Sequence, residues 1–281
     1  MKILYLSLSL LACGSDGRGG GTIDARGADG QSGSNGSNAV TSRVYAHSGS
    51  TLYRIDTVNF GTVQIGPLAG LGSASMTDIA VDKNDHMVGV TLNKLYSVDA
   101  STGACTLIKD LSTSTHNPTS LSYVPADLND PNSADILVTA DSVGDVYQID
   151  EATGSASKIG SYGTYLNNRV VSSGDLIGVR GLGIYATVDV GSGAGSAAND
   201  FLAVIDPATW TATPIGTGTG YNNIFGLGFW AGKIYGFVDD KTNHTGKIIA
   251  IDPNTGKGTE ILSSAIEWYG AGVTTDAPII E

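Results

Sequence analysis

The residues best suited to bind a metal ion lie in one loop rich in Asp and Asn, between positions 127 and 135. Five side chains of this loop offer oxygen atoms: Asp127, Asn129, Asp130, Asn132 and Asp135. Oxygens at alternating positions are the ligands that a hard cation such as Ca²⁺ takes. The loop lacks the Asp-x-Asp-x-Asp-Gly order and the later Glu of an EF-hand. The pattern therefore favours a solvated loop, with a Ca²⁺ site as the alternative.

Catalytic side chains form no recognisable motif in this chain. Its four histidines are isolated in sequence: His47, His86, His116 and His244. No His-Glu-x-x-His, Gly-x-Ser-x-Gly or Cys-x-x-Cys pattern occurs, and these are the short patterns that mark zinc, serine and redox sites. A zinc site or a nucleophile–base pair could still assemble from distant loops. We assign no catalytic residue, and the sequence leans against an enzyme without deciding the matter.

A cysteine near the start of the chain stands in a setting that predicts lipid attachment. Lys2 is followed by ten mostly apolar residues at positions 3–12, too few for a helix that spans a bilayer, which needs about 20. Such a run fits a secretory signal. The sequence Leu10-Leu11-Ala12-Cys13 resembles the lipobox of bacterial lipoproteins. That resemblance implies fatty acyl chains such as palmitate on Cys13 and removal of residues 1–12. An ordinary signal peptide is the alternative.

Residues 13–40 are expected to act as a flexible tether behind this anchor. Gly, Ser, Asp and Asn dominate positions 14–38, and such a stretch cannot bury enough apolar surface to become ordered. Its root-mean-square reach is about 25–30 Å. In the lipoproteins that this segment resembles, an Asp directly after the cysteine retains the protein at the inner membrane. Here that position is Gly14. We therefore expect the bacterial envelope as location, the outer membrane rather than the inner one, with the protein facing the periplasm or the surface.

The composition excludes some partners and favours an all-β fold. The chain has 39 glycines, 15% charged residues and a net charge of −12. No basic patch is available to neutralise phosphates, so nucleic acid is not an expected partner. Abundant Gly, Thr, Ser, Asp and Asn suit short strands and tight turns. Cys105 lies in an alternating run and is expected to be a buried small apolar residue.

An internal repeat is the main architectural signal. Five segments share an apolar–polar alternation that ends in Asp, followed by a turn and a second alternating run: LYRIDTVNFGTVQIG, LYSVDASTGACTLIK, VYQIDEATGSASKIG, LAVIDPATWTATPIG and IIAIDPNTGKGTEIL. The shared residues are Asp56, Asp99, Asp150, Asp206 and Asp252, at spacings of 43, 51, 56 and 46. Repeats of this length built from short strands are typical of propeller blades. We expect each Asp to accept hydrogen bonds in its turn, and not to bind a metal.

These repeats predict one β-propeller domain over residues 41–281. Each repeat is a hairpin of outer strands, and two inner strands precede it in four of the five units. The first unit lacks an innermost strand, and the segment 270–277 resembles one. The prediction is therefore five four-stranded blades closed by the C-terminal strand, with six or seven blades less favoured. Residues 43–276 resemble bacterial extracytoplasmic propellers with Leu-Tyr-x-Ile-Asp-x-x-Thr-Gly repeats, a resemblance that concerns architecture and not activity.

A ligand site is expected where loops meet at one end of the channel. In propellers, the loops between blades and those between the second and third strands share that face. Aromatic and amide groups there could bind by stacking and hydrogen bonding. The candidates are His116, Tyr162, Tyr165, Asn168, Arg169, Tyr221, Asn222, Asn223, Trp268 and Tyr269. The alternative is that several of the aromatic rings fill gaps between blades.

Three functions remain open on the sequence. The favoured hypothesis is a monomeric, lipid-anchored binding module for a protein, peptide or glycan. The second is a metal-dependent hydrolase or lactonase with acidic ligands at the channel. The third is a structural protein of the envelope. Three or four carboxylates or histidines at coordination distance would favour the second.

Overall fold

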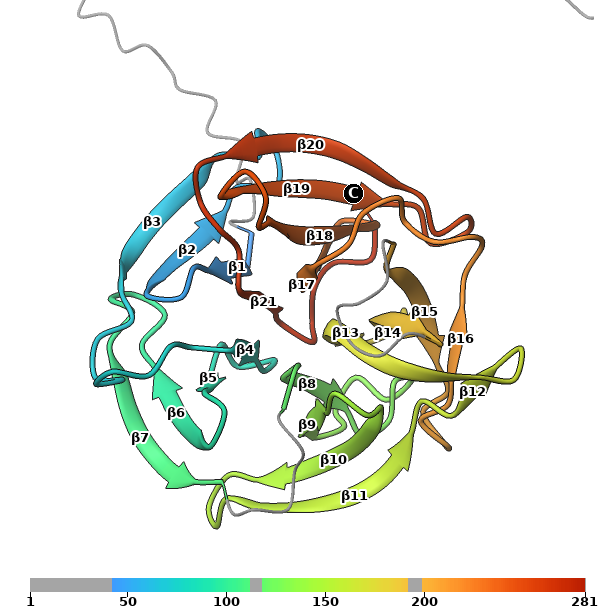
Figure 1. The fold of residues 1–281 in the computed structure, drawn as a ribbon. Coiled ribbons are helices and arrows are strands. Elements are labelled where there is room, and N and C mark those ends of the chain that lie inside the picture. Colours follow the sequence, from blue (N-terminus) through green and yellow to red (C-terminus); the bar gives the residue numbers. More distant parts are fainter. Residues whose placement is uncertain (1–41, 112–117, 192–198, 281) are drawn as a thin grey trace, which may run out of the picture. The chain divides into compact units, whose positions relative to one another are not determined.

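The computed structural model describes residues 42–111, 118–191 and 199–280, and the regular elements in these ranges are β-strands. The chain divides into two units, Met1–Ala39 and Val40–Glu281. The expected signal peptide and the whole of the expected tether lie outside the described residues. The described part of the second unit holds five sheets arranged as blades around a central axis (Figure 1).

Each blade is an antiparallel sheet in which chain order runs outward from the axis, except that the innermost strand of the first blade is the last strand of the chain. The first blade has β21 (Gly270–Val273), β1 (Val44–His47), β2 (Thr51–Ile55) and β3 (Thr62–Pro67). The second has β4 (Asp78–Val81), β5 (Met87–Val90), β6 (Lys94–Val98) and β7 (Cys105–Asp110). The third has β8 (Ser122–Pro125), β9 (Asp135–Ala140), β10 (Asp145–Asp150) and β11 (Ser155–Ser161).

The remaining two blades follow the same plan. The fourth has β13 (Asn168–Val179), β14 (Gly183–Val190), β15 (Phe201–Ile205) and β16 (Ala212–Pro214), with the two-residue β12 (Thr164–Tyr165) added beside β13. The fifth has β17 (Ile224–Trp230), β18 (Lys233–Asp240), β19 (Thr245–Ile251) and β20 (Gly258–Ser264). The prediction of an all-β, five-bladed propeller is confirmed.

Ring closure is made by the two ends of the propeller sequence. β21 pairs antiparallel with β1, with Val44 opposite Val273 and His47 opposite Gly270. This pairing supplies the innermost strand that the first repeat lacks, as predicted, and it covers the edge of β1 that would otherwise be free. The strand is shorter than the segment 270–277, because a turn follows in which the Ala277 amide donates to the Thr274 carbonyl at 3.2 Å.

One segment differs from the expected arrangement. Residues 162–169 were expected to form a loop between blades, but β12 and the start of β13 form a hairpin there. Leu166 and Asn167 at its tip both have positive φ, 49° and 64°, as a two-residue hairpin turn requires. The extra length between the third and fourth repeats is therefore an extension of blade four, not a degenerate sixth blade.

The repeated Asp residues act as turn acceptors, as the sequence predicted. In each outer hairpin, the Asp side chain accepts a hydrogen bond from the amide two residues later, at 2.7–2.9 Å. The acceptors are Asp56, Asp99, Asp150, Asp206 and Asp252. This contact fixes the turn and so repeats the same hairpin five times.

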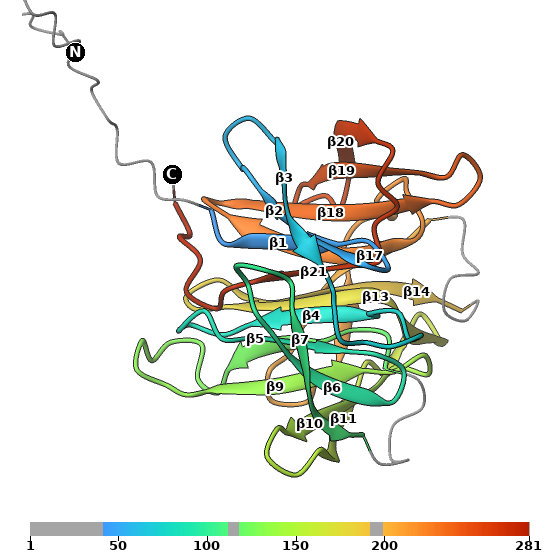
Figure 2. The ribbon, with the colours of Figure 1, turned by 90° about the vertical axis from the view of Figure 1, so that its left-hand side faces the viewer.

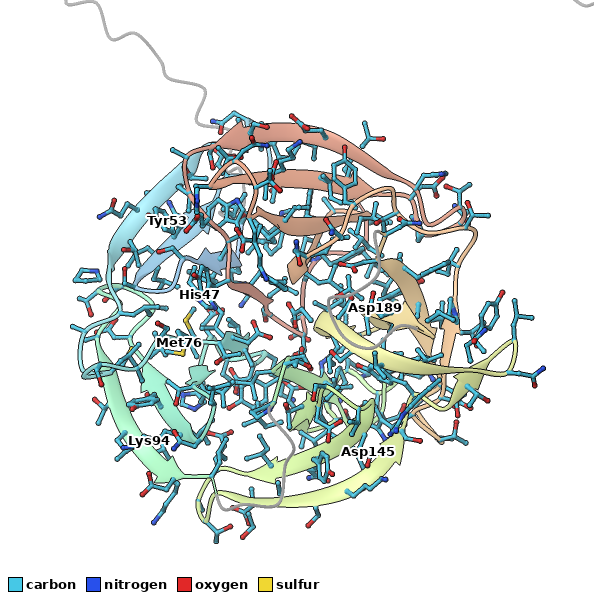
Figure 3. The ribbon with its side chains drawn as sticks, viewed as in Figure 1. His47, Tyr53, Met76, Lys94, Asp145 and Asp189 are labelled. Carbon is cyan, nitrogen blue, oxygen red and sulfur yellow. The ribbon has the colours of Figure 1, made fainter. Side chains whose placement is uncertain are left out.

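The core lies between the blades, and large side chains fill the gaps. Trp268 is fully buried, with ring centroids 5.5 Å from Tyr53 and 5.6 Å from Phe237, both edge-on. These contacts join the first and fifth blades through an arrangement that aromatic rings prefer. Figure 3 shows the radial order, with His47 near the axis and Lys94 and Asp145 toward the outer rim.

Buried carboxyl groups join inner strands of neighbouring blades. Asp78, the first residue of β4, accepts a hydrogen bond from the Leu121 amide of the third blade at 2.7 Å. Asp175 in β13 accepts one from the Leu227 amide of the fifth blade, also at 2.7 Å. The two carboxyls are fully buried and hydrogen-bond each other. Burial raises the pKa of both carboxyls well above its usual range, because it disfavours their charged forms.

The close approach of the inner strands yields a stability prediction. A Cβ on Gly226 in β17 would lie 2.6 Å from the Ala271 amide nitrogen of β21, whereas one on Gly49 would meet nothing nearer than 3.6 Å. We expect Gly226→Ala to lower the free energy of unfolding by about 1–3 kcal/mol, because backbone must shift. Gly49→Ala is the control. Urea midpoints at neutral pH measure the difference, and equal midpoints for the two variants would contradict this packing.

Candidate functional site

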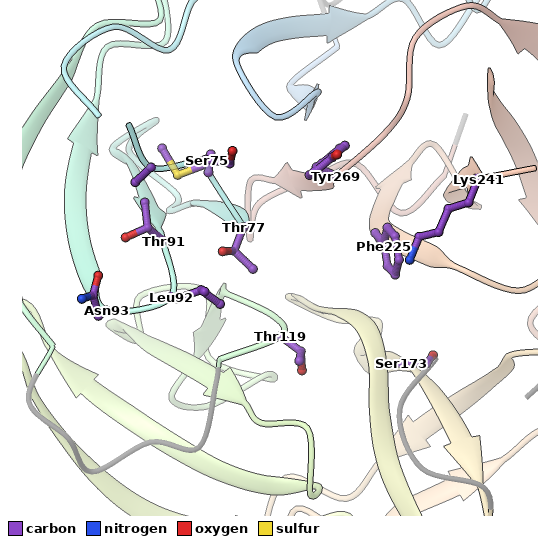
Figure 4. A pocket seen from close by; sticks show the side chains of 12 residues that line it. Ser75, Thr77, Thr91, Leu92, Asn93, Thr119, Ser173, Phe225, Lys241 and Tyr269 are labelled. Atoms are coloured by element: carbon purple, nitrogen blue, oxygen red, sulfur yellow. The ribbon is translucent and has the colours of Figure 1, made fainter. Parts of the chain in front are cut away.

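A cavity of about 920 Å³ opens at one end of the channel, where all five blades contribute residues (Figure 4). We call it the channel mouth. Its walls come from the β3–β4, β7–β8 and β20–β21 links, from the β5–β6 and β18–β19 loops, and from β13 and β17. These are the two kinds of loop that the sequence predicted to share one face. The volume lies in the range of small-molecule sites.

The walls of the channel mouth combine apolar surface with neutral polar groups. Leu92 and Tyr269 keep 64% and 42% of their surface exposed, and Phe225 and Ala74 extend the apolar area. Hydroxyl and amide groups complete the lining: Ser75, Thr77, Thr91, Asn93, Thr119 and Ser173. A concave apolar surface with a few polar groups is what small-molecule sites usually present.

Leu92 stands out because of its position in a turn. The Thr91 amide donates to the Lys94 carbonyl at 2.9 Å, which closes the short connection between β5 and β6. Turns of this kind are normally occupied by Gly, Asn, Asp or Ser. A leucine at the tip leaves apolar surface in water and gains nothing for the turn. The arrangement places that surface on the edge of the channel mouth (Figure 4).

Lys241 supplies the charge of the channel mouth. Among the described lining residues it is the one with a charged side chain. Its Nζ lies 4.7 Å from the centroid of the Phe225 ring, a cation–π contact. Lys241 also lines an adjoining cavity of about 290 Å³, together with Tyr221, Asn222 and Asn223. The channel mouth therefore continues, past the lysine, into a smaller polar cavity.

A third cavity borders the channel mouth at Tyr269. It has a volume of about 500 Å³ and includes His244 and Glu267, whose Nδ1 and Oε1 atoms are 2.8 Å apart. Both side chains are partly exposed, with His244 at 81%. Tyr269 separates this surface pair from the apolar walls of the channel mouth.

The candidate ligand residues separate into three groups. Tyr269 lines the channel mouth, and Tyr221, Asn222 and Asn223 line the adjoining polar cavity. Tyr162 and Trp268 have no exposed surface and fill gaps in the core, which was the alternative reading of the aromatic residues. Tyr165, Asn168 and Arg169 belong to the β12–β13 hairpin and line none of the three cavities. His116 lies outside the described residues.

The Asp- and Asn-rich loop is bound by cationic side chains of the chain itself. Arg180 pairs with Asp135, and its Nη1 and Nη2 atoms donate to the carbonyls of Asp130 at 3.1 Å and Ser133 at 2.9 Å. The Lys83 ammonium donates to the Ser133 carbonyl at 2.8 Å. The carboxylates of Asp127 and Asp130 accept the amides of Asn129 and Asn132 at 2.9 and 2.8 Å. These contacts occupy oxygens that the sequence had offered to Ca²⁺.

This loop lies away from the channel mouth. The Arg180 amide donates to the Thr275 carbonyl and the Gly181 amide to the Leu128 carbonyl, both at 2.9 Å. The β8–β9 loop, the β13–β14 turn and the segment after β21 are therefore tied together. Figure 2 shows the β8–β9 loop and this C-terminal segment on the same side of the ring.

The described residues contain no group of three or more His, Cys, Asp or Glu side chains that could hold a metal ion. The hydrolase hypothesis asked for such a group. The nearest approach to one is His47 beside Asp78: a Cβ on Gly270 would lie 2.5 Å from His47 Nε2 and from an Asp78 carboxyl oxygen. Burial lowers the pKa of His47 to about 4, so its ring is neutral at neutral pH.

Sequence reasoning did not single out the buried acids Asp78, Asp175 and Asp200. A signal for two of them was present, because Asp78 and Asp175 each stand directly before an apolar run in an inner-strand repeat, in TDIAV and GDLIGV. Leu92 and Lys241 were also missed. Leu92 could have been found as an apolar residue within a turn sequence, TLNK.

Comparison with known proteins shows the fold and no family. No family model and no curated protein matches the chain. A chain in the crystal structure of a nidogen/laminin complex superimposes with a TM-score of 0.50 at 12% identity, over 82% of this chain and 96% of that one. At this identity the likeness concerns the propeller fold alone.

Other matching structures come from Bacteroides species. A protein of unknown function from Bacteroides thetaiotaomicron VPI-5482 gives a TM-score of 0.48 and 15% identity, over 69% of this chain and 53% of that protein, about half its length. A protein of unknown function from Bacteroides caccae gives a TM-score of 0.44 and 8% identity, over 82% of this chain and 97% of that chain.

Within the residues that the structure describes, no helix has the length and apolarity to cross a bilayer.

A pH-dependent stability follows from Asp200, a buried acid that directly precedes β15. Its Oδ2 accepts the Ile224 amide at 2.9 Å. Burial, with Asp189 nearby, raises the pKa of Asp200 to about 8, whereas an unfolded Asp has a pKa of about 3.9. The folded state therefore binds the proton more tightly, and this contribution to stability, complete below pH ~4, is lost as the pH rises toward 8.

Asp200→Asn imitates the protonated acid and should remove this dependence. We expect the free energy of unfolding of the unchanged protein to fall between pH 5 and about 8 relative to that of the variant. Denaturant titrations at several pH values measure the difference. The same change at Asp110, which is 76% exposed, controls for the loss of a carboxylate. Parallel pH profiles for the protein and Asp200→Asn would contradict the assignment.

Proposed function

We propose that this protein is a lipid-anchored binding module of the bacterial envelope, and that its propeller binds a small ligand at the channel mouth. The observation that carries the proposal is the position of that cavity between the blades, together with the exposed apolar side chains at its rim. All five blades contribute to a space of about 920 Å³ whose rim holds an exposed leucine and an exposed tyrosine. Solvent-exposed apolar surface in a concave place is a mark of binding sites.

A purely structural envelope protein would gain nothing from this arrangement. The ring is held by strand pairing, by aromatic packing and by the buried carboxyls, none of which involves the Leu92 side chain. A polar residue at that turn would serve the fold better. The cost of exposing leucine is offset if a ligand covers it, which favours a binding function over a structural one.

Lipid anchoring is the second part of the proposal and rests on the sequence. The run at positions 3–12 ends in Leu10-Leu11-Ala12-Cys13, and the glycine-rich tether follows. Cys105, the other cysteine, is 8% exposed, and burial raises the pKa of its thiol to about 11. A buried thiol of raised pKa is unreactive, so Cys13 is the acceptor for a lipid. The tether would let a monomeric propeller stand away from the membrane.

Acylation is tested by metabolic labelling of the full-length chain in a bacterial host. Cells that receive labelled palmitate should incorporate label into the protein and retain it in the membrane fraction. Cys13→Ser should remove both the label and the retention, while Cys105→Ser should keep both. Label that persists after Cys13→Ser, or an unlabelled protein in the soluble fraction, would refute the anchor.

The binding site is tested on residues 40–281. This unit contains the closed ring and the described core clusters, so we expect it to fold alone. Amide NMR spectra would be recorded with a panel of oligosaccharides, short peptides and organic acids. Compounds that bind should shift the signals around Leu92 and Tyr269.

The matched variants are Leu92→Asp at the channel mouth and Val58→Asp in the β2–β3 turn, where the valine is 82% exposed. Each replaces an exposed apolar side chain with a carboxylate. Leu92→Asp should abolish the shifts and Val58→Asp should preserve them. Shifts confined to other surfaces, or unaffected by Leu92→Asp, would place binding elsewhere and reject the proposed site.

A further inference from the structure

We infer that the ligand of the channel mouth is an organic monoanion with an apolar body, such as a medium-chain carboxylate. The inference rests on the proposed function and names its ligand class. Three features carry it: a cationic group that forms no ion pair among the described residues, an apolar wall across the cavity from it, and neutral polar groups between them.

The ammonium of Lys241 is available to an anion. None of the ion pairs among the described residues includes Lys241, whose ammonium lies 4.7 Å from the centroid of the Phe225 ring. Its charge also acts at longer range on the Asp239 carboxyl, whose pKa it lowers. The lysine ammonium has three N–H donors. The ring face attracts its positive charge but does not accept hydrogen bonds from these donors as a carboxylate would. The ring holds the ammonium at the wall of the channel mouth, where a ligand anion could accept from it.

The acidic residues near Lys241 do not cancel this role. Asp240, its neighbour in the chain, is bound by the Asn243 side-chain amide at 2.9 Å and by the amide of Thr242 at 3.2 Å. The pKa of Asp239 is raised, first by burial and then by Glu267, with Lys241 acting in the opposite direction; the net shift disfavours its charged form. Both acids line the adjoining polar cavity with Lys241, but neither lines the channel mouth, and no described lining residue there is acidic.

The local charge is unusual for this chain. The sequence has 27 acidic residues against 15 Lys and Arg, a net charge of −12. Such a surface repels anions in general. A cavity lined by one lysine and no described acid is therefore a place where an anion is favoured. One lysine matches one negative charge, because a dianion would need further donors or cations to replace its water.

The apolar wall gives the other half of the ligand. Figure 4 places Leu92 across the opening from Phe225 and Lys241, with Thr77 and Thr119 between them. A ligand that spans the cavity would bury its body against Leu92, which is 64% exposed, and present its anionic end to the lysine. Each buried CH₂ contributes about 0.8 kcal/mol, so a chain of several carbons adds appreciably to affinity.

A series of equal-length probes separates the charge from the apolar part. Decanoate, decanol and decyltrimethylammonium, each below its micelle-forming concentration, would be titrated calorimetrically into residues 40–281. We expect decanoate to bind at least about tenfold more tightly than decanol, as a charge-assisted hydrogen bond provides, and decyltrimethylammonium to bind more weakly than either.

Variants assign the two effects to residues. Lys241→Gln should reduce the decanoate-to-decanol affinity ratio to near one, and Lys241→Arg should preserve it. Lys257→Gln, an exposed lysine in the β19–β20 turn, makes the same change in net charge and should leave the ratio unchanged. Leu92→Ala should weaken decanoate and decanol by the same factor. Urea midpoints verify that each variant is folded.

The outcomes distinguish this inference from the proposed function. Equal binding of decanoate and decanol, or a ratio unaffected by Lys241→Gln, would overturn the monoanion. If decanoate does not bind while another compound of the panel shifts the signals around Leu92, the binding site stands and its ligand class is wrong. If no compound reaches the channel mouth, both proposals fail.

Discussion

The hydrogen-bonded pair of carboxyl groups of Asp78 and Asp175 is the interaction on which the remainder of this structure depends. Each accepts a hydrogen bond from an amide of the next blade, and burial raises the pKa of both carboxyls well above its usual range. They thereby connect the second, third, fourth and fifth blades at the axis. Removing one partner would leave the other with a buried polar group unsatisfied, which is costly. The β1–β21 pairing then completes the ring.

This inner ring defines the shape of the channel mouth. Thr77 and Ser173 line the cavity, while Asp78 and Asp175, one and two residues further along, have no exposed surface. The inner strands also approach one another closely, since a Cβ on Gly174 would lie 1.9 Å from the Ile224 carbonyl oxygen. The described inner strands thus form a floor below the cavity. Short loops above this floor, such as the one that carries Leu92, can differ in chemistry without disturbing it.

The architecture was predictable because it repeats. Each outer hairpin contains the same Asp turn, so five copies of one local signal reinforce each other, and the missing strand of the first unit pointed to closure by the C-terminus. The functional residues were less predictable, because the role of each depends on whether its side chain points into the core or into the channel mouth. Trp268 and Tyr269 are adjacent in sequence, yet one is fully buried and the other 42% exposed. Likewise, the sequence favoured a solvated Asp- and Asn-rich loop, with a Ca²⁺ site as the alternative, and did not reveal its partner Arg180, which lies 45 residues beyond Asp135.

The most direct test of the central claim, that the channel mouth holds an organic ligand, is native mass spectrometry with elemental analysis. Residues 40–281 would be purified from a bacterial periplasm without detergent and sprayed under non-denaturing conditions. The account predicts a bound organic species of small mass in the unchanged protein that is absent after Leu92→Asp, with no stoichiometric metal. A stoichiometric metal ion without an organic species would contradict it and favour the hydrolase.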